Sequence, residues 1–581
     1  MPEYTISMGL FARGMGNGKK FFPQMGICDF ECALPDRLRA RGCLTHNARA
    51  MDTFDYIIVG AGSAGCVLAN RLTESGRNSV CLLEAGGLDK DFKIRVPAAF
   101  CQLFRTENDW AYETEPQAHA DNRRMFWPRG KVIGGCSAIN AMIYIRGNRL
   151  DYDRWRELGC PGWGYDDVLP YFKKSENQSR HSLAHHGPSG NLFVNDLIEP
   201  NILSKTFVDA CGELGVPQND DFNGASQIGA GLYQVTQRNG QRNSAANAFL
   251  EPALRRDNIQ VIAMAHALRL VFDNTRVTGV VYGHPRSQQK EQTVLARKQV
   301  ILCGGAVNTP QLLMLSGIGP KAHLASLGID CVADLPGVGQ NLQDHLVAPI
   351  AYHCKEPVSI GKADNLFNLL RFFLMKRGPF TSNVAEAGAF VRFDGTVNVP
   401  DFQIHFGPAI FLKHGADAPK IHGFTIGPTL IYPKSRGEIT LKNANAFDAP
   451  AIQPNYFSES VDLDVMVDAF RFCRKIIQAD AFAPYRGTER NPGADVQLTD
   501  EIKAYLRTMS ETIYHPVGTC KMGVDPMAVV SPRLSVHGIQ GLRVADASIM
   551  PEIVGGNTNA PCIMIGEKAA DIIREDDEDL R

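Results

Sequence analysis

The first clear pattern along the chain is a short apolar run over residues 54–59, Phe-Asp-Tyr-Ile-Ile-Val. Its β-branched and aromatic residues predict a strand that is buried on both faces of a parallel sheet. A glycine-rich turn, residues 60–65, comes next, and residues 66–72 have the apolar spacing of a helix. A second strand is predicted at Val80–Leu83, and Glu84 follows it directly.

The glycine-rich turn has the spacing of a dinucleotide-binding loop, with Gly60, Gly62 and Gly65 in a G-x-G-x-x-G arrangement. The glycines permit a tight turn and a close approach of backbone to ligand, and the helix N-terminus directs N–H groups toward a pyrophosphate. Glu84 can accept a hydrogen bond from a ribose hydroxyl. The sequence therefore predicts a bound dinucleotide, and these residues alone leave FAD and NAD both open.

The middle of the chain has a different pattern. Residues 401–406 and 437–441 alternate apolar and polar side chains and predict strands of an antiparallel sheet that is covered on one face. The most apolar stretch, Leu366–Met375, is interrupted by Asn368 and Arg371, so no transmembrane helix is predicted. This stretch could lie on a membrane surface, but a helix that closes over a cleft is the favoured interpretation.

Composition narrows the class of protein. The 581 residues exceed the size of a single core, and 60 basic against 62 acidic side chains argue against a nucleic-acid binder. The 15 cysteines form no C-x-x-C pair, so neither a disulfide scaffold nor a structural zinc site is expected, and no metal is predicted. A reducing, cytoplasmic location is expected, with peripheral membrane contact and oligomeric state left open. Residues 1–50 lack sustained periodicity and are treated as a leader of uncertain status, before a folded body that begins at Met51.

Two long glycine-rich stretches, Gly130–Asn140 and Gly305–Gly319, stand out in the rest of the chain. Together with four shorter motifs they make residues 51 to about 573 similar to the glucose–methanol–choline (GMC) family of flavin oxidoreductases. The shorter motifs are Gly337–His345, Tyr514–Gly523, Val544–Ala547 and Asn557–Pro561.

The resemblance implies FAD and two domains. One is a Rossmann-like α/β domain that binds FAD, and the other is an α+β substrate domain built on an antiparallel sheet with helices. The FAD domain is expected over 51–340 and again over 514–573, with the substrate domain over 341–513 and a solvated tail over 574–581.

The resemblance also implies which residues contact the cofactor. A histidine that tethers the flavin covalently in some relatives is replaced here by Ile139, so the FAD is expected to be non-covalent. The cofactor-binding residues implied are Gly60, Gly62, Ser63, Ala64, Gly65, Glu84, Val132, Gly134, Asn140, Ala141, Met142, Ile143, Ala267, Tyr514, Asp546, Ala547, Asn557 and Thr558.

Catalysis is expected to depend on two residues of the C-terminal motifs. His515 occupies the position of the family's general base, a task that suits imidazole because its pKa lies near neutral pH. Asn559 is the expected partner that orients the substrate oxygen. His405 is a candidate substrate-pocket residue, and a strand histidine packed under the flavin is the equal alternative. His345 and Cys520 are expected to be structural, and Trp155 and Trp163 are expected to be packing residues.

The resulting expectation is oxidation of a primary alcohol or polyol to an aldehyde or ketone, with the proton taken by His515 and hydride by flavin N5. A quinone or similar acceptor is expected to take the electrons. An oxygen-using oxidase and a hydroxynitrile lyase remain alternatives, whereas a light-driven decarboxylase is disfavoured because residues 430–433 lack a Cys-Arg pair. The rate constant kcat/KM is expected to rise with pH through a histidine-like transition.

Overall fold

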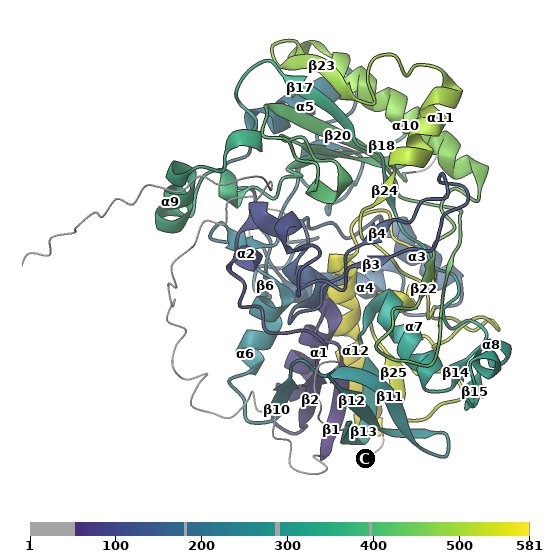
Figure 1. Ribbon diagram of the computed structural model, residues 1–581. Coiled ribbons are helices and arrows are strands. Elements are labelled where there is room, and N and C mark those ends of the chain that lie inside the picture. The colour runs from purple at the N-terminus through teal and green to yellow at the C-terminus, as the bar shows by residue number, and fades with distance from the viewer. Residues whose placement is uncertain (1–52, 179, 181–182, 285–290, 394–397, 580–581) are drawn as a thin grey trace, which may run out of the picture. The chain divides into compact units, whose positions relative to one another are not determined.

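Two sheets organise the chain, one near each end of the view in Figure 1. The structure is a computed structural model that describes residues 53–579 apart from 179, 181–182, 285–290 and 394–397. The predicted leader, residues 1–50, lies outside the described residues.

The first sheet is built around the two predicted strands, β1 (Thr53–Val59) and β2 (Val80–Leu83). Its order is β10-β2-β1-β13-β12-β11, and β25 pairs with β13. The pairs β10–β2, β2–β1, β1–β13 and β13–β25 are parallel, while β11, β12 and β13 are antiparallel neighbours. The other strands are β10 (Ile259–Ile262), β11 (His266–Asp273), β12 (Arg276–Gly283), β13 (Gln292–Leu302) and β25 (Leu542–Val544).

Helix α1 (Ser63–Thr73) follows β1 and begins three residues before the predicted start. Ten of its eleven residues are buried, because it packs against α12 (Asn559–Asp579), the last helix of the chain. Arg71 of α1 and Glu567 of α12 form a buried ion pair with two contacts of 2.8 Å. The C-terminal helix is therefore fixed directly against the nucleotide-binding unit.

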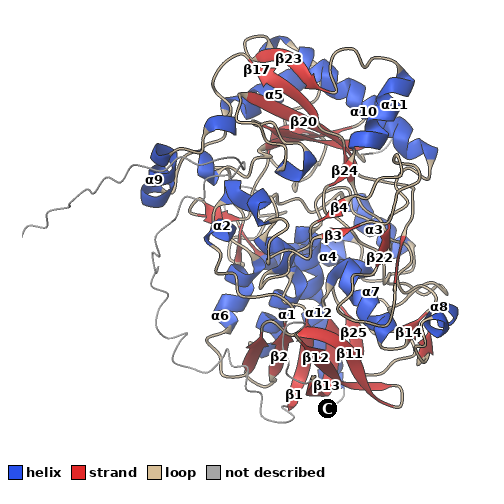
Figure 2. Cartoon of the chain, in the orientation of Figure 1, coloured by secondary structure: helices blue, strands red, loops and turns tan. Residues whose placement is uncertain are grey.

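The second sheet is antiparallel, in the order β23-β17-β20-β19-β18-β7, with β16 joining β20 to β24. Helices α5 (Ile202–Glu213) and α10 (Ser460–Gln478) pack on this sheet, and α11 (Thr499–Met509) packs on α10 (Figure 2). The strands are β7 (Gly229–Leu232), β16 (Leu346–Val347), β17 (Ile350–Cys354), β18 (Ala387–Val391), β19 (Phe402–Gly407), β20 (Gly423–Leu430), β23 (Arg486–Asn491) and β24 (Glu511–Thr512).

Shorter elements connect the two sheets. The helices are α2 (Phe92–Arg95), α3 (Arg149–Glu157), α4 (Tyr165–Ser175), α6 (Glu251–Ala253), α7 (Gly305–Leu315), α8 (Lys321–Ser326) and α9 (Leu366–Met375), with 3-10 turns that include η2 (Pro97–Leu103), η3 (Gly135–Ala138) and η6 (Pro379–Thr381). The remaining strands are β3 (Tyr112–Glu113), β4 (Phe126–Trp127), β5 (Glu176–Asn177), β6 (Leu192–Phe193), β8 (Gln237–Arg238), β9 (Gln241–Arg242), β14 (Ile318–Gly319), β15 (Ala333–Asp334), β21 (Glu438–Thr440) and β22 (Ala451–Gln453).

Three details differ from the sequence-based expectations. Strand β7 belongs to the second sheet, although it lies within the range expected for the FAD domain. The predicted strand at 437–441 does form, as β21, but it pairs with β22 in a separate two-stranded ribbon and does not join the second sheet. The described part of the expected tail, residues 574–579, continues α12; Glu575, Glu578 and Asp579 are exposed, while Asp577 pairs with Lys298 at 2.7 Å.

Among the described residues, no helix is both long enough and apolar enough to cross a membrane.

Candidate active site

A cavity of about 340 Å³ lies between the two sheets. Val59, Leu83 and Leu302, the last residues of β1, β2 and β13, line it from the first sheet. The carboxyl ends of parallel strands are where open α/β sheets bind their ligands. Phe406 of β19 and Thr425 of β20 line the cavity from the second sheet.

The glycine-rich turn forms one end of the cavity, and its three glycines have different roles. Gly60 has a φ of +104°, and a Cβ there would lie 2.5 Å from the Cys303 carbonyl oxygen. A Cβ on Gly65 would lie 1.9 Å from the Gly60 carbonyl oxygen, so this glycine permits close packing of helix on strand. A Cβ on Gly62 would meet nothing within 4 Å, and as the N-cap of α1 Gly62 provides no side chain to cap the first turn. Gly62, Ser63 and Ala64 line the cavity, so the uncapped first turn of α1 borders it, and a helix N-terminus in that position suits an anion.

Glu84 lies beside this turn at the end of β2. Its two carboxylate oxygens accept hydrogen bonds from the N–H groups of Ala61 (2.9 Å) and Gly86 (2.8 Å). Burial raises the pKa of Glu84 to about 7. Each carboxylate oxygen can accept a further bond, so Glu84 can still receive a ribose hydroxyl. Ala267, one of the predicted cofactor-binding residues, lines the same cavity.

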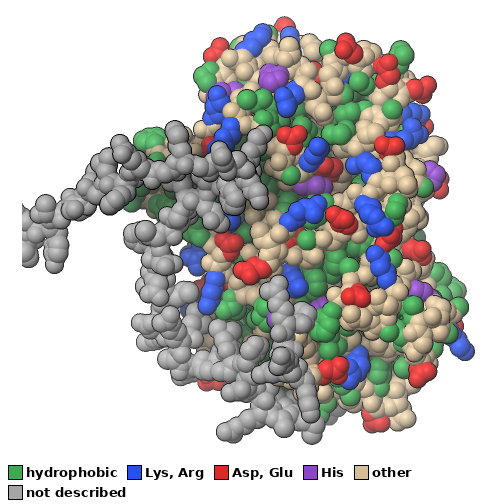
Figure 3. Space-filling view, viewed as in Figure 1, with side chains coloured by type: hydrophobic (Ala, Val, Ile, Leu, Met, Phe, Trp, Pro, Cys, Tyr) green, Lys and Arg blue, Asp and Glu red, His purple; other side chains and the backbone are tan. Residues whose placement is uncertain are grey.

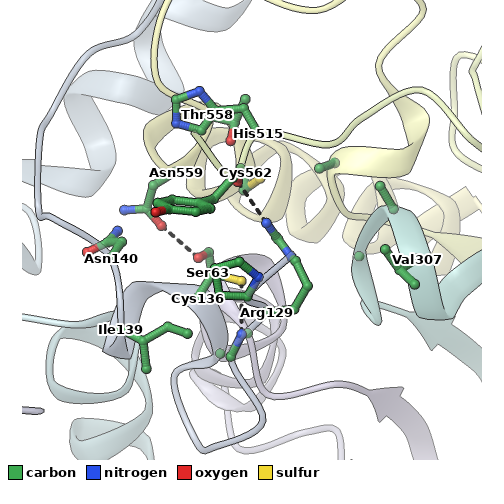
Figure 4. A pocket seen from close by; sticks show the side chains of 18 of the residues that line it. Ser63, Arg129, Cys136, Ile139, Asn140, Val307, His515, Thr558, Asn559 and Cys562 are labelled. Atoms are coloured by element: carbon green, nitrogen blue, oxygen red, sulfur yellow. Dashed lines mark hydrogen bonds between the residues drawn. The ribbon is translucent and has the colours of Figure 1, made fainter. Parts of the chain in front are cut away.

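Asn559 and Asp546 organise the middle of the cavity. The Ser63 hydroxyl donates a 2.7 Å hydrogen bond to Asn559 Oδ1, which joins the starts of α1 and α12 (Figure 4). Asp546 accepts bonds from the Gly305 N–H, at 2.8 Å, and the Thr309 hydroxyl, at 2.6 Å. It also accepts two bonds from Ser548. The Asp546 carboxylate therefore holds the start of α7 beside the returning C-terminal segment.

The predicted base, His515, lies in the cavity wall in contact with two other side chains. His345 Nδ1 and His515 Nδ1 are 3.0 Å apart, and Asn557 Nδ2 lies 3.3 Å from His515 Nε2. Asn559, the expected partner, is bonded to Ser63 instead, because it begins α12 while Asn557 lies in the preceding loop. His345, which was expected to be structural, thus lies in direct contact with His515.

These contacts determine the tautomer of His515. His345 Nε2 lies 3.0 Å from the carbonyl oxygen of Ile431, which can only accept, so this nitrogen carries the proton. Burial lowers the pKa of His345 to about 3, so the ring is neutral and its Nδ1 is an acceptor. His515 Nδ1 must therefore be the donor, which leaves a lone pair on His515 Nε2.

His405 lies on β19 and lines the cavity. Its Nδ1 is 3.1 Å from the Tyr233 hydroxyl, while its buried Nε2 has no hydrogen-bond partner in the described part of the chain. Burial lowers the pKa of His405 to about 4, so the ring is neutral. Asn557 Oδ1 is likewise buried without a partner among the described residues. Two polar atoms are thus available to a ligand near His515.

The other predicted cofactor residues divide into two groups. Ala64, Asn140, Ala141, Met142, Ile143, Tyr514, Ala547 and Thr558 line the cavity, as does Ile139. Gly65, Val132 and Gly134 lie behind its wall, where Gly134 forms a left-handed turn with a φ of +95°.

Several lining residues were not predicted. Arg129 donates a 2.7 Å hydrogen bond to the Tyr514 carbonyl and directly precedes the glycine-rich Gly130–Asn140 motif, a position that could have drawn attention to it. Phe100 stacks on Phe411 and meets Phe104 edge-on, and all three line the cavity. No sequence pattern distinguishes such aromatic residues from ordinary core residues.

The residues expected to be inert are buried away from the cavity lining. Cys520, Trp155 and Trp163 have no exposed surface, and the two tryptophan rings pack 6.2 Å apart. Within the described ranges, no group of three or more His, Cys, Asp or Glu side chains is placed to hold a metal ion.

Comparisons with known proteins agree with this geometry. Models of the GMC oxidoreductase family match residues 54–347 and 433–566. The chain is 46% identical over 527 residues to an alcohol dehydrogenase [acceptor] of Pseudomonas putida, covering 90% of this chain and 95% of the relative. It is 45% identical over 528 residues to an oxygen-dependent choline dehydrogenase of Brucella suis biovar 1, covering 89% and 95%.

Solved structures show the same fold. Pyridoxine 4-oxidase from Mesorbium loti superposes with a TM-score of 0.82 at 32% identity, covering 90% of this chain and 99% of the other. A formate oxidase of Aspergillus oryzae, studied for its FAD modification, superposes with a TM-score of 0.86 at 28% identity, covering 92% and 100%.

FAD fits the residues present. The open space at Gly62 and the uncapped first turn of α1 suit its pyrophosphate, and the cavity extends from Glu84 to His515. FAD is the cofactor of this fold, and a two-sheet architecture with a glycine-rich turn at the end of β1 positions it. The chain is a member of the GMC oxidoreductase family.

Proposed function

We propose that this protein is an FAD-dependent alcohol dehydrogenase in which His515 Nε2 is the general base. The observation that carries the proposal is the hydrogen-bond chain from the Ile431 carbonyl through His345 to His515. It leaves the acceptor nitrogen of His515 in the cavity wall, beside Asn557. An alcohol proton is not acidic enough to leave unaided, so a positioned base is the first requirement of the reaction.

Each residue then has one task. The alcohol O–H donates to His515 Nε2, and the amide N–H of Asn557 donates to the alcohol oxygen and stabilises the charge that develops there. His405 Nε2, which has no partner among the described residues, is available to position the substrate. Gly62 and Ser63 at the start of α1 hold the pyrophosphate of FAD, which when bound supplies the acceptor for the hydride.

His515 is suited to accept a proton because it is neutral. Burial lowers the pKa of His515 well below its usual value of 6.5, and the positive charge of Arg129 lowers it further. The base is therefore unprotonated throughout the neutral range. The rise of kcat/KM with pH, which the sequence placed at a histidine-like pKa, is therefore proposed to occur at acid pH.

The cavity wall near the second sheet favours an alcohol with an apolar or aryl substituent. Val347, Val384 and Phe406 contribute apolar surface there, and the cluster of Phe100, Phe104 and Phe411 adds aromatic surface. Such a lining excludes water and gains free energy from the apolar part of a primary alcohol.

A choline-like substrate is the second candidate. Aromatic faces also attract quaternary ammonium groups, and Glu511 lines the cavity. Burial raises the pKa of Glu511 to about 7, so its negative charge is incomplete at neutral pH. Comparing kcat/KM for choline and for its neutral carbon isostere separates the two candidates, because the pair differs only in charge. A preference for the isostere supports the apolar substrate.

The electron acceptor is proposed to be a quinone or similar carrier; the name of the Pseudomonas putida relative refers to an acceptor without specifying it. Rates measured with a dye acceptor and with oxygen alone separate a dehydrogenase from an oxidase. Anaerobic addition of substrate separates both from a lyase, since only alcohol oxidation bleaches the yellow flavin absorbance.

The test of the base is His515→Ala, with His119→Ala at an exposed position as the matched control. We expect His515→Ala to lose roughly 10²–10⁴-fold in kcat while retaining FAD, since a general base typically contributes that much. His119→Ala should match the wild type. Near-normal turnover of His515→Ala would remove this histidine from the mechanism.

A further inference from the structure

Helix α9 (Leu366–Met375) presents an apolar face to solvent. Leu366, Phe367, Leu370, Phe373 and Leu374 follow helical spacing and are 66%, 73%, 49%, 45% and 81% exposed. Met375, the next residue, is 63% exposed. Six of the twenty large hydrophobic side chains exposed among the described residues therefore lie on this one helix. An apolar patch of this kind marks an interaction site in a soluble domain.

The helix is anchored by its opposite face. Phe372 is completely buried and packs with Val96, Ala99 and Phe380. Phe92 of α2 (Phe92–Arg95) stacks on Phe373 with ring centres 5.1 Å apart and extends the exposed patch. The predicted helix at Leu366–Met375 thus forms with the expected bounds, but its apolar side faces outward instead of covering a cleft.

The apolar patch is flanked by positive charge. Residues 89–95 and 362–377 together contain seven cations and three acids, in a chain whose net charge is −2. Of the acids, Asp364 is paired with Lys420 at 2.6 Å. Glu199, outside these two segments, contacts Arg371 at 2.9 Å and Arg377 at 3.9 Å, so it offsets part of the positive charge. Lys93, Arg95, Lys362 and Arg377 are exposed, and the Lys376 ammonium lies 5.3 Å from the centre of the Phe372 ring. Aromatic and aliphatic side chains ringed by lysine and arginine are typical of helices that lie in the interface of an anionic bilayer.

This surface lies close to the cavity. Ala99, which packs on Phe372, belongs to η2 (Pro97–Leu103), and the next residue, Phe100, lines the cavity. In Figure 1, α9 projects from the side of the described chain, and in the same view hydrophobic side chains are visible at that position (Figure 3).

We propose that α9, together with α2, docks this protein on the surface of an anionic phospholipid membrane. The exposed side chains of α9 enter the headgroup boundary, and the flanking cations pair with lipid phosphates. The apolar cavity of the enzyme is thereby held next to the phase in which apolar alcohols and quinones dissolve. The docking itself requires neither the proposed substrate nor the proposed acceptor.

The test is co-sedimentation of the holoenzyme with vesicles of phosphatidylcholine alone and of phosphatidylcholine with phosphatidylglycerol. We expect binding to the anionic vesicles and weakening of that binding by high salt, which screens the charge. Phe367→Ser with Leu374→Ser should lower the partition coefficient at least roughly tenfold, because apolar insertion carries the affinity. Lys93→Glu with Arg377→Glu should abolish the preference for anionic vesicles.

The matched control is Leu498→Ser with Val524→Ser, two positions that are 67% and 74% exposed and lie outside α9. This control should sediment like the wild type, and all variants should retain FAD. Failure of the wild type to bind anionic vesicles would overturn the proposal. Conversion of an oligomer to a monomer by the α9 variant, without vesicle binding by the wild type, would assign the patch to a second copy of the chain instead.

Discussion

Gly62 and Gly65 are three residues apart in the same turn, yet alanine at each should have a different effect. Gly62 has a φ of −81° and a ψ of −161°, which alanine adopts without strain, and a Cβ there meets no protein atom within 4 Å. The Cβ of an alanine at position 62 would project into the space that we assign to the cofactor. A Cβ at Gly65 would lie 1.9 Å from the Gly60 carbonyl oxygen, which is a backbone atom, and Gly65 itself is buried in α1.

The magnitudes follow from these distances. At position 65 the backbone must move by more than an ångström to relieve the contact, and overpacking of this kind costs about 1–3 kcal/mol or more in free energy of unfolding. At position 62 the folded chain is unaffected, but loss of the close approach removes a hydrogen bond to a charged phosphate. Such a bond contributes about 1.5–3 kcal/mol, which weakens FAD binding roughly 10- to 150-fold.

Two measurements separate the variants. Urea unfolding of the FAD-free proteins should give a wild-type midpoint for Gly62→Ala and a clearly lower midpoint for Gly65→Ala. Titration of the FAD-free proteins with FAD should show weakened binding for Gly62→Ala. Wild-type affinity in Gly62→Ala would refute the assignment of the α1 N-terminus to the pyrophosphate, and a wild-type midpoint in Gly65→Ala would refute the packing argument.

Three further predictions concern the proposed base, its neighbour His345 and the ion pair between α1 and α12. Because the base must be neutral and burial lowers the pKa of His515 below 6.5, kcat/KM should stay constant across neutral pH and fall only in acid; a rise centred near neutrality would contradict this reasoning. His345→Phe should lower kcat/KM roughly 5- to 150-fold with FAD retained, whereas His345→Gln, which can still donate and accept, should recover part of the loss. Glu567→Gln should lower the free energy of unfolding by about 3 kcal/mol because it leaves the buried Arg71 charge with only the half-exposed Glu74, 3.6 Å away, as a contacting carboxylate. Asp166→Asn in an exposed pair should cost no more than about 1 kcal/mol, and both are measured by urea unfolding.

The local pattern of apolar, polar and glycine residues was sufficient to predict those helices and strands whose conformation depends on neighbouring residues. Strand β2 and helix α9 have the predicted bounds, and β1 differs by one residue, because alternation, helical spacing and glycine positions act within a few residues. The family resemblance located His515 in the same way, from a motif read along the chain.

The sequence did not show which of the two amides, Asn557 or Asn559, lies beside His515, and the structure was needed to decide this. The two amides are two residues apart, and only the start of α12 decides that Asn559 turns toward Ser63 while Asn557 faces His515. The contact between His345 and His515 joins positions 170 residues apart, and neither motif contains a signal for it.

The sequence by itself determined the nucleotide-binding turn and the family, and it supplied His515 as the proposed base, because each was read from a short motif of residues that are close together in the chain. The tertiary structure alone decided that β7 joins the second sheet, which tautomer His515 adopts, and which face of α9 is exposed. These features depend on which distant segments pack against each other, and hydrophobic periodicity specifies that a face is apolar without specifying what covers it.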